Sequence, residues 1–146
     1  MNYFKSIEIE DSKICYDLDL ISMNLWSQNQ WENEIKKSNV RGLGIYSDKG
    51  IIGTCIFLKI FDEAELRYLV IHPEHRRKGL GKKLFYEFLK ECIFENISKV
   101  FLEVSNKNIE AINLYNYFGF ETIGLRKKYY KDGSDALIKE KKMLKK

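Results

Sequence analysis

The amino-acid sequence predicts a single α+β (α/β) domain built on a mixed central sheet. Its 146 residues fall within the usual size of one domain, roughly 100–200 residues, so residues 1–146 are expected to share one fold. Stretches with the alternation typical of strands are interrupted by stretches whose apolar residues recur at helical spacing. In chain order they give β-α-α-β-β-β-α-β-α-β-β, with no repeat and no linker. The 45% hydrophobic content and the single proline favour a folded chain over a disordered one.

The first half of the chain is expected to supply two helices and four strands. A strand at residues 3–9 leads to a helix that begins after Asp11, a suitable N-cap residue. Ser27 and Gln30 form an S-x-x-Q capping box, which predicts the start of a second, short helix. Three strands follow, at residues 41–46, 51–60 and 64–71, with turns at residues 47–50 and 62–63. We expect these three strands to form an antiparallel meander.

The second half opens with a long amphipathic helix. Lysines and glutamates take one face, and apolar residues recur at helical spacing on the other, namely Leu80, Leu84, Phe85, Phe88, Leu89, Cys92 and Ile93. A strand at residues 99–104 and a turn at residues 106–108 precede a short helix from Ile109, for which Gly119 is a suitable C′ glycine. The chain is expected to close as a hairpin of residues 120–130 and 135–144 around residues 131–134.

The composition excludes several classes of protein. Twenty-five Lys and Arg against 21 Asp and Glu give a net charge of +4, too small an excess to indicate a nucleic-acid-binding surface. The cysteines, Cys15, Cys55 and Cys92, are too widely spaced for a disulfide framework or a structural zinc site, and Cys55 and Cys92 fall on apolar faces. No signal peptide is recognisable, and no apolar run approaches the roughly 20 residues that span a bilayer. We therefore expect a reduced, cytoplasmic chain that binds no metal, membrane or specific nucleic acid.

The strongest local signal is a basic, glycine-containing turn between the strand at residues 64–71 and the long helix. It reads Arg76-Arg77-Lys78-Gly79-Leu80-Gly81. Backbone N–H groups at a helix N-terminus attract anions, and glycines let a pyrophosphate approach the backbone closely. A basic turn that only reverses the chain has a similar composition. The position after a strand and before a helix, with three cations, favours anion binding.

This turn and the order of elements resemble the GNAT superfamily of N-acetyltransferases, in which R/Q-x-x-G-x-G/A binds the pyrophosphate of acetyl-CoA. The resemblance implies the GNAT fold and acetyl-CoA as co-substrate, without a metal. It also implies that the strand before the turn carries a bulge and that its backbone contacts the coenzyme. The implied coenzyme contacts are Leu69, Val70, Ile71, Arg76, Arg77, Lys78, Gly79, Leu80, Gly81, Lys82 and Asn108. Asn108 is equally suited to be the N-cap of the short helix.

Several weaker motifs resemble the RimI-like branch of this superfamily, the bacterial protein N-terminal alanine acetyltransferases. They are Trp26-Ser27, Asp62-Glu63-Ala64, Leu102-Glu103-Val104, Ala111-Ile112-Asn113-Leu114-Tyr115, Phe118-Gly119-Phe120 and Arg126 with Tyr129-Tyr130. The resemblance implies that the acceptor is a protein N-terminus, that of a ribosomal protein, and we expect a monomer or weak homodimer. Two features depart from the branch. His72 stands where an acidic residue is common, and residues 20–38 match only through Trp26-Ser27.

Glu103 and Tyr115 are the candidate catalytic residues. Alternation along its strand places Glu103 opposite the apolar face, where a glutamate is commonly just solvated, and the resemblance makes it the general base. Since an α-amine has a reference pKa of about 7.7–8.0, a modest base is sufficient. Tyr115, otherwise a core tyrosine, matches the general acid that protonates the coenzyme sulfur. Tyr130, otherwise a packing residue of the last hairpin, matches tyrosines that close over the substrate peptide. Transfer is expected to be direct, without an acyl-enzyme.

Two other functions stay open. The same fold with another acceptor would acetylate a small-molecule amine, a polyamine or a lysine side chain, and an acidic pocket for a polyamine could come from Asp17, Asp19, Glu32 and Glu34. A non-catalytic CoA- or RNA-binding module would use the basic turn and the C-terminal lysines, Lys139, Lys141, Lys142, Lys145 and Lys146. His72 and His75 could act as a base, although histidines beside a proline turn are more commonly just exposed.

Overall fold

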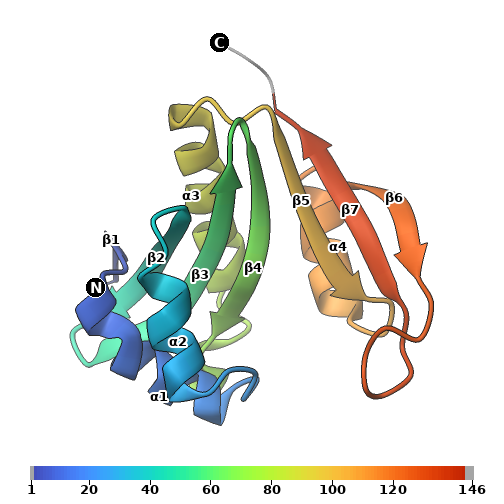
Figure 1. Cartoon of the computed structure of the whole chain (residues 1–146). Coiled ribbons are helices and arrows are strands. Elements are labelled where there is room, and N and C mark those ends of the chain that lie inside the picture. Colours follow the sequence, from blue (N-terminus) through green and yellow to red (C-terminus); the bar gives the residue numbers. More distant parts are fainter. Residues whose placement is uncertain (1, 144–146) are drawn as a thin grey trace.

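The structure, a computed structural model, describes residues 2–143 and confirms the predicted order of elements. One seven-stranded sheet has the order β1-β2-β3-β4-β5-β7-β6 (Figure 1). Its strands are β1 (Tyr3–Ser6), β2 (Val40–Ser47), β3 (Gly50–Ile60), β4 (Glu63–Ile71), β5 (Lys99–Ser105), β6 (Glu121–Arg126) and β7 (Ala136–Lys142). The α-helices are α1 (Ser12–Ile21), α2 (Gln28–Ile35), α3 (Leu80–Phe94) and α4 (Ile109–Tyr117), and two short 3-10 helices are Ile9–Asp11 and Pro73–His75.

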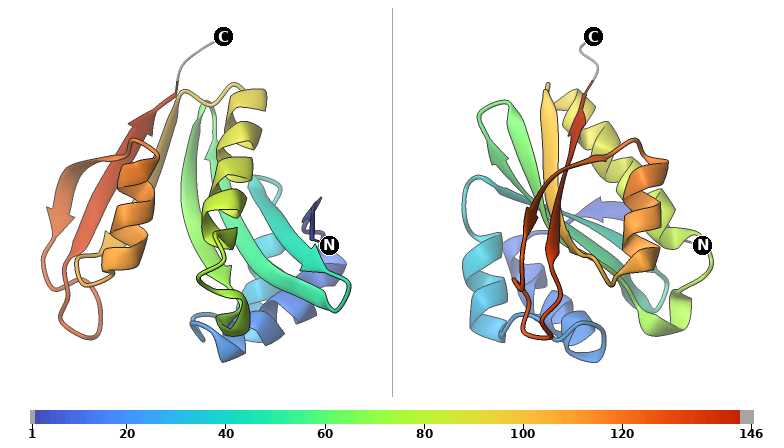
Figure 2. Two further views of the ribbon diagram at one scale, coloured as in Figure 1. Left: turned by 180° about the vertical axis from the view of Figure 1, so that it is seen from behind. Right: turned by 90° about the vertical axis from the view of Figure 1, so that its right-hand side faces the viewer.

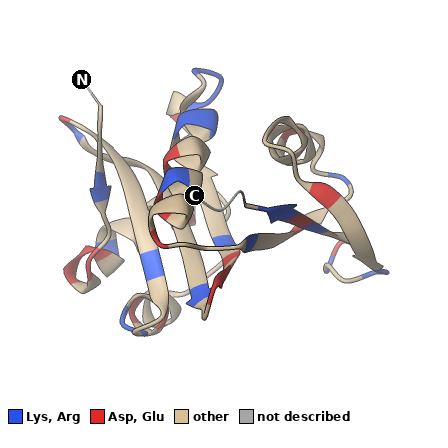
Figure 3. Cartoon of the chain, turned by 90° about the horizontal axis from the view of Figure 1, so that it is seen from above, with Lys and Arg blue, Asp and Glu red and all other residues tan. Residues whose placement is uncertain are grey.

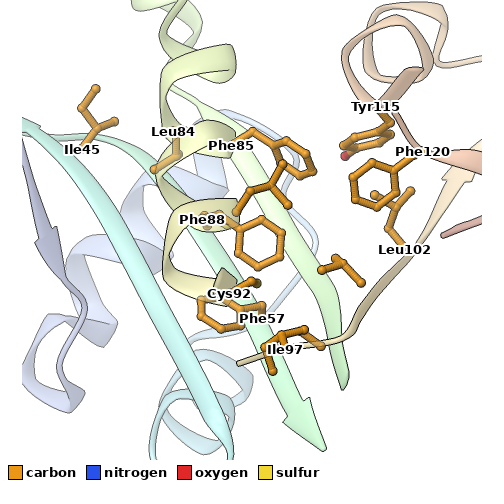
Figure 4. Close-up of a cluster of buried hydrophobic side chains, with 14 of the residues drawn as sticks. Ile45, Phe57, Leu84, Phe85, Phe88, Cys92, Ile97, Leu102, Tyr115 and Phe120 are labelled. Atoms are coloured by element: carbon orange, nitrogen blue, oxygen red, sulfur yellow. The ribbon is translucent and has the colours of Figure 1, made fainter. Parts of the chain in front are cut away.

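Helices cover both faces of the sheet. Helices α3 and α4 lie on one face, and α1 and α2 lie on the other (Figure 2). The larger core lies under α3, where Leu84, Phe85 and Phe88 have no exposed surface (Figure 4). The smaller core lies under α1 and α2, around Trp31 and Ile56. Helix α3 therefore buries the face that its apolar spacing predicts.

The predicted capping residues define the ends of α2 and α4. The Ser27 hydroxyl accepts a hydrogen bond from the Gln30 N–H at 3.1 Å, and the Gln30 side chain accepts one from the Ser27 N–H at 2.7 Å, so the capping box is confirmed. Asn108 Oδ1 accepts from the Ala111 N–H at 3.1 Å at the start of α4. Gly119 follows α4 in the left-handed conformation, with a φ of 86°.

The two middle strands, β4 and β5, separate along the sheet. They pair in parallel only between residues 63–65 and residues 99–101. Beyond this point β4 stays paired with β3, and β5 stays paired with β7, so the sheet divides into two halves (Figure 1). Strand β4 also carries a bulge at Arg67, because its pairing with β3 shifts by one residue between Ile56 and Phe57. Beyond residues 65 and 101, the backbone groups of β4 and β5 that face each other are therefore not paired within the sheet.

The N-terminal strand and the β3–β4 turn differ from their predicted bounds. Only Tyr3–Ser6 pair with β2, because the chain then enters a 3-10 helix in which Glu8 and Asp11 form a capping box. The turn between β3 and β4 consists of Phe61 and Asp62, one residue earlier than predicted, and Phe61 adopts a φ of 55°.

The last hairpin has shorter strands and a longer loop than predicted. Strand β6 ends at Arg126 and β7 begins at Ala136, so the prediction that Tyr130 lies on a strand is wrong. Asp132 Oδ1 accepts hydrogen bonds from the N–H and the hydroxyl of Ser134, at 2.9 and 2.6 Å, and these bonds curl the loop back on itself. Leu144, Lys145 and Lys146, which the predictions included, lie outside the described residues. No helix within the described range has the length and apolarity needed to cross a membrane.

Candidate active site

The basic turn leads directly into α3 and leaves its N-terminus open. Gly79 is the N-cap residue, with a φ of 76°, a left-handed conformation that glycine adopts without steric cost. A Cβ placed on Gly79 would meet no atom within 4 Å. The first N–H groups of α3 need partners from outside the helix. Basic residues precede them in the turn, and Lys82 and Lys83 follow within the first turn of α3. Figure 3 marks the Lys and Arg positions along the ribbon in blue. A pyrophosphate therefore fits at this helix end.

The cations of the turn have different surroundings. Arg76 Nε donates a hydrogen bond to the Ile71 carbonyl oxygen at 3.0 Å, which ties the turn to the end of β4. Arg77 and Lys78 are exposed. The Lys82 ammonium lies 3.7 Å from the ring centroid of Tyr117, and so links α3 to α4. Leu80 is buried in the larger core, where it anchors the first turn of α3. The coenzyme contacts of these residues stay predictions.

The end of β4 directs backbone groups toward the separation between β4 and β5. The His72 N–H donates to the Ile52 carbonyl oxygen of β3 at 2.7 Å. In a trans peptide the carbonyl and the following N–H point in opposite directions, so the Ile71 carbonyl faces away from β3. In a strand the N–H and the carbonyl of one residue point to the same side, and alternate residues share that side. The N–H groups of Leu69 and Ile71 therefore also face away from β3. These N–H groups are placed to bind a carbonyl oxygen lying between the two strands. Val70 turns its backbone toward β3 and its side chain into the smaller core.

Tyr115 projects from α4 toward α3. Its side chain is 7% exposed, and its ring lies 5.3 Å from Phe85 and 6.0 Å from Phe120 between ring centroids (Figure 4). Burial raises the pKa of the Tyr115 hydroxyl above its ordinary value, and the neighbouring Cys55 and Tyr130 raise it further. Tyr115 therefore keeps its proton at neutral pH. Tyr115 is thus a core tyrosine, and its role as the general acid stays a prediction.

Glu103 lies on the opposite face of β5 from the buried Val104, as the alternation predicts. Its side chain is 35% exposed, and its Oε2 is 3.2 Å from Arg126 Nε of β6. Arg126 also lies over the ring of Tyr129, 5.6 Å from the centroid. The sequence alone did not predict the Glu103–Arg126 ion pair. This ion pair depends on the register in which β7 pairs with β5 on one side and with β6 on the other.

Tyr130 lies in the loop between β6 and β7, near both candidate catalytic residues. The loop holds it through a hydrogen bond from its N–H to the Ser134 carbonyl at 3.2 Å and one from the Gly133 N–H to its carbonyl at 3.0 Å. Partial burial raises the pKa of Tyr130, and the charge of Glu103 raises it further. Tyr130 in turn raises the pKa of Tyr115, so Glu103 acts electrostatically on Tyr130, and Tyr130 on Tyr115. The three side chains come from α4, β5 and the β6–β7 loop, 27 residues or fewer apart in sequence.

Three of the four acidic residues considered as a polyamine pocket, Asp17, Asp19 and Glu34, are already paired or buried, which leaves only Glu32 exposed without such a partner among the described ion pairs. Asp19 has no exposed surface and accepts hydrogen bonds only from within the protein. Glu34 is paired with Lys37 and Arg67, at 3.0 and 3.3 Å, and Asp17 is paired with Lys13 at 3.1 Å. These carboxylates are therefore already neutralised or sequestered.

Two other sequence expectations change in the structure. Lys139 is 3% exposed, and its ammonium donates to Asn116 and Thr122 at 2.9 Å each, so the expectation that it belongs to a solvated basic tail is wrong. Its position on β7 instead fastens α4 to the last hairpin. His72 and His75 are half-buried rather than freely exposed, with ring centroids 5.3 Å apart, and His72 Nδ1 accepts from the Glu74 N–H at 3.0 Å.

Comparison with known proteins identifies the family. Residues 8–120 match the family described as "Acetyltransferase (GNAT) family". A Bacillus subtilis (strain 168) protein, provisionally named a ribosomal protein bS18-alanine N-acetyltransferase, is 31% identical over 137 residues, 92% of this chain and 91% of the relative. The ribosomal protein bS18-alanine N-acetyltransferase of Escherichia coli (strain K12) is 27% identical over 142 residues, 94% of this chain and 95% of the relative.

Solved structures agree with the sequence matches. The crystal structure of the Escherichia coli ribosomal-protein-S18-alanine N-acetyltransferase superposes with a TM-score of 0.90 at 26% identity, covering 96% of this chain and 92% of that one. The PaiA N-acetyltransferase of Thermoplasma acidophilum, in complex with coenzyme A, superposes with a TM-score of 0.79 at 25% identity, covering 98% and 99%. The GNAT fold expected from the sequence is thus confirmed. The chain belongs to the acetyltransferase (GNAT) family and is an acetyl-CoA-dependent N-acetyltransferase.

Proposed function

We propose that this chain acetylates a protein N-terminal α-amine in the cytoplasm, and that its acceptor is a ribosomal protein. The observation that supports this most directly is the grouping of Glu103, Tyr115 and Tyr130 beside the separated strands, in a chain that is similar over nearly its whole length to ribosomal protein bS18-alanine acetyltransferases. Each of the three comes from a different element. Glu103 and Tyr115 have the chemical groups that the reaction needs, and Tyr130 is the candidate contact of the acceptor peptide.

In this proposal the chain holds acetyl-CoA at two places. The N-terminus of α3 and residues 76–78 bind its pyrophosphate, and the edge of β4 binds its acyl end, where the bound coenzyme supplies an acetyl thioester. The N–H groups of Leu69 and Ile71 donate to the thioester carbonyl oxygen. Because these donors are fixed in the strand, they stabilise the negative charge that develops on that oxygen without having to reorganise.

Glu103 takes the proton from the acceptor amine. Its partly exposed carboxylate is accessible from the face of the sheet that carries α1 and α2, either directly or through a water molecule. An α-ammonium has a reference pKa of about 7.7–8.0, against about 10.4 for a lysine ammonium. A carboxylate can therefore deprotonate an α-ammonium far more readily than a lysine ammonium. The neutral amine then attacks the carbonyl carbon.

Tyr115 acts on the departing sulfur. Its raised pKa keeps the hydroxyl protonated at neutral pH. A thiol, with a reference pKa near 8.5, is a much stronger acid than a buried phenol, so complete proton transfer from Tyr115 to the thiolate is unfavourable. Tyr115 is better suited to donate a hydrogen bond to the developing thiolate in the transition state. This role stabilises the leaving group while the tyrosine retains its proton.

The charge beside Glu103 disfavours a polyamine acceptor. Arg126 Nε lies 3.2 Å from Glu103, so an acceptor ammonium that approaches this carboxylate comes close to a guanidinium. Two like charges about 4 Å apart repel by about 1 kcal/mol in water, and each further positive charge on the acceptor adds to that cost. A peptide N-terminus brings one ammonium followed by neutral peptide groups, and thereby avoids the additional repulsion.

The test is acetyl-CoA-dependent release of free thiol with three sets of acceptors. These are short peptides with a free N-terminal alanine, the same peptides N-blocked but containing lysine, and spermidine. Release with the free N-termini alone supports the proposal, and a peptide from a ribosomal protein then serves as the next acceptor. Release only with the blocked peptides or with spermidine contradicts it, and Tyr115→Phe serves as the control for enzymatic release.

A further inference from the structure

One buried carboxylate organises the loop between α1 and α2, residues 22–27. Asp19, near the C-terminal end of α1, has no exposed surface. Its Oδ1 accepts a hydrogen bond from the Leu25 N–H at 2.9 Å, and its Oδ2 accepts one from the Trp26 N–H at 2.8 Å. Its backbone carbonyl also accepts from the N–H groups of Ser22 and Asn24, at 3.0 and 2.6 Å. Asp19 therefore gathers most of the backbone donors of this loop.

The same carboxylate connects the loop to α2 and to β4. Oδ2 accepts from the indole Nε1 of Trp31 at 2.9 Å, and Oδ1 accepts from the hydroxyl of Tyr68 at 2.8 Å. Burial, together with this hydrogen bond to Asp19, raises the pKa of Tyr68, so that it stays a donor. With two donors on each oxygen, the acceptor capacity of the carboxylate is well used, which is what a buried charge requires. Among the ion pairs of residues 2–143, none involves Asp19.

Aromatic packing makes this connection rigid. The ring centroid of Trp26 lies 4.7 Å from that of Trp31 and 5.3 Å from that of Tyr68, and the centroids of Trp31 and Tyr68 lie 4.9 Å apart. Tyr68 is adjacent to Leu69, whose N–H faces the strand separation, and it follows the bulge residue Arg67, which pairs with Glu34 of α2 at 3.3 Å. The loop is thus attached to the part of β4 that borders the predicted acyl site.

The loop lies at the end of the sheet where β4 and β5 are apart. Figures 1 and 2 show it at the same end as the β6–β7 loop, with the strand separation between them. Met23 and Leu25 of the α1–α2 loop are 51% and 53% exposed, although their neighbours Asp19 and Trp31 are buried. The hydrogen bonds to Asp19 hold the backbone in the form that turns these two apolar side chains outward.

We propose that Asp19 is a positioning residue for the acceptor peptide. By fixing the α1–α2 loop to β4, it presents Met23 and Leu25 to the first residues of the acceptor and sets the distance of the peptide from the acyl site. The inference rests on the proposed function, because it takes this loop as one wall of the acceptor site. The hydrogen bonds of Asp19 do not extend to the turn at residues 76–81, so the binding of the coenzyme pyrophosphate does not depend on it.

The test compares Asp19→Asn and Tyr68→Phe with wild type. Asparagine keeps the volume of Asp19 but replaces one accepting oxygen with a donor, whereas Tyr68→Phe removes one of the four donors to the carboxylate and keeps the ring. We expect Asp19→Asn to lower kcat/KM for the peptide roughly 10- to 100-fold, the size of effect that a small misplacement of a reactant has, mainly through the peptide KM. The acetyl-CoA Kd should keep its wild-type value. Tyr68→Phe should change the same parameter in the same direction, but less.

Asp17→Asn is the matched control, since Asp17 lies on the same helix and makes only an exposed pair with Lys13. It should behave as wild type. The proposal is overturned if Asp19→Asn, folded by circular dichroism, has wild-type peptide kinetics, or if its acetyl-CoA Kd rises as much as its peptide KM. If Asp19→Asn does not fold, Tyr68→Phe decides, and wild-type peptide kinetics in that variant overturn the proposal. Failure of the proposed function is a distinct outcome, because the wild-type enzyme would then prefer another acceptor. The variants are in that case compared with wild type on the preferred acceptor.

Discussion

Replacing Gly79 with alanine distinguishes an anion site from a simple chain reversal. The structure predicts a modest loss of stability. An L-residue in the left-handed conformation costs roughly 1–2 kcal/mol, and the new methyl group meets no atom of the protein within 4 Å. For a domain of this size the loss corresponds to a Tm lower by roughly 3–8 °C. The variant is therefore expected to fold.

Acetyl-CoA binding should suffer more than stability. The methyl group stands at the N-terminus of α3, in the open space through which a pyrophosphate would reach the backbone N–H groups. Each hydrogen bond to a charged group contributes about 1.5–3 kcal/mol, so the loss of one such bond raises the acetyl-CoA Kd roughly 10- to 100-fold. Isothermal titration with acetyl-CoA measures this change directly.

Gly133→Ala is the matched control for the backbone effect. Gly133 has a φ of 84°, a Cβ there would also meet no atom within 4 Å, and it lies in the β6–β7 loop, away from α3. It should lose a similar amount of stability and keep the wild-type acetyl-CoA Kd. Equal Kd values in the two alanine variants would refute the reasoning, because the turn before α3 would then only reverse the chain.

Four further predictions concern the reacting groups. Tyr115→Phe should keep the wild-type Tm and acetyl-CoA Kd while kcat falls by roughly 10²-fold or more, since only the hydroxyl is lost; wild-type turnover would remove Tyr115 from the mechanism. Because burial raises the pKa of Tyr115, wild-type kcat/KM should rise with pH as the acceptor amine loses its proton and should not fall again below about pH 10; a fall between pH 8 and 10 would contradict this protonation state. Glu103→Gln should slow transfer most at low pH, where the amine is protonated, and a pH profile that coincides with wild type would move the base elsewhere. Arg126→Gln should raise kcat/KM for spermidine relative to a peptide roughly fivefold, the equivalent of about 1 kcal/mol of repulsion, and an unchanged ratio would show that Arg126 has no influence on the acceptor.

The turn before α3 was predictable because its signals are local. Gly79, three cations and the start of an amphipathic helix follow one another within a few residues, and each has a conformational or electrostatic meaning of its own. The capping box of Ser27 and the N-cap of Asn108 are local in the same way, and the structure confirms both. The order of elements followed from hydrophobic spacing, which also comes from near neighbours.

The acceptor side was not predictable, because its contacts join distant parts of the chain. The bond between Asp19 and Tyr68 spans 49 residues, and without it an aspartate on a helix is typical of a solvated face. The ion pair of Glu103 with Arg126 requires that β7 insert between β5 and β6 in one register. The predicted bounds of the last hairpin were wrong for a local reason, since Ser134 donates its N–H and its hydroxyl to Asp132 and so holds this segment as a loop.

This difference between the two sides has a physical consequence for acceptor choice. A helix N-terminus binds a pyrophosphate with groups that any chain can supply locally, whereas the α1–α2 loop keeps its form only while Trp31 and Tyr68 donate to Asp19 from two other elements. A change within residues 22–27 alone therefore alters the side chains of the acceptor wall but leaves its backbone where Asp19 holds it. The proposed acceptor site therefore predicts that acceptor preference is set at two levels, by the exposed Met23 and Leu25 and by the buried carboxylate that fixes their positions.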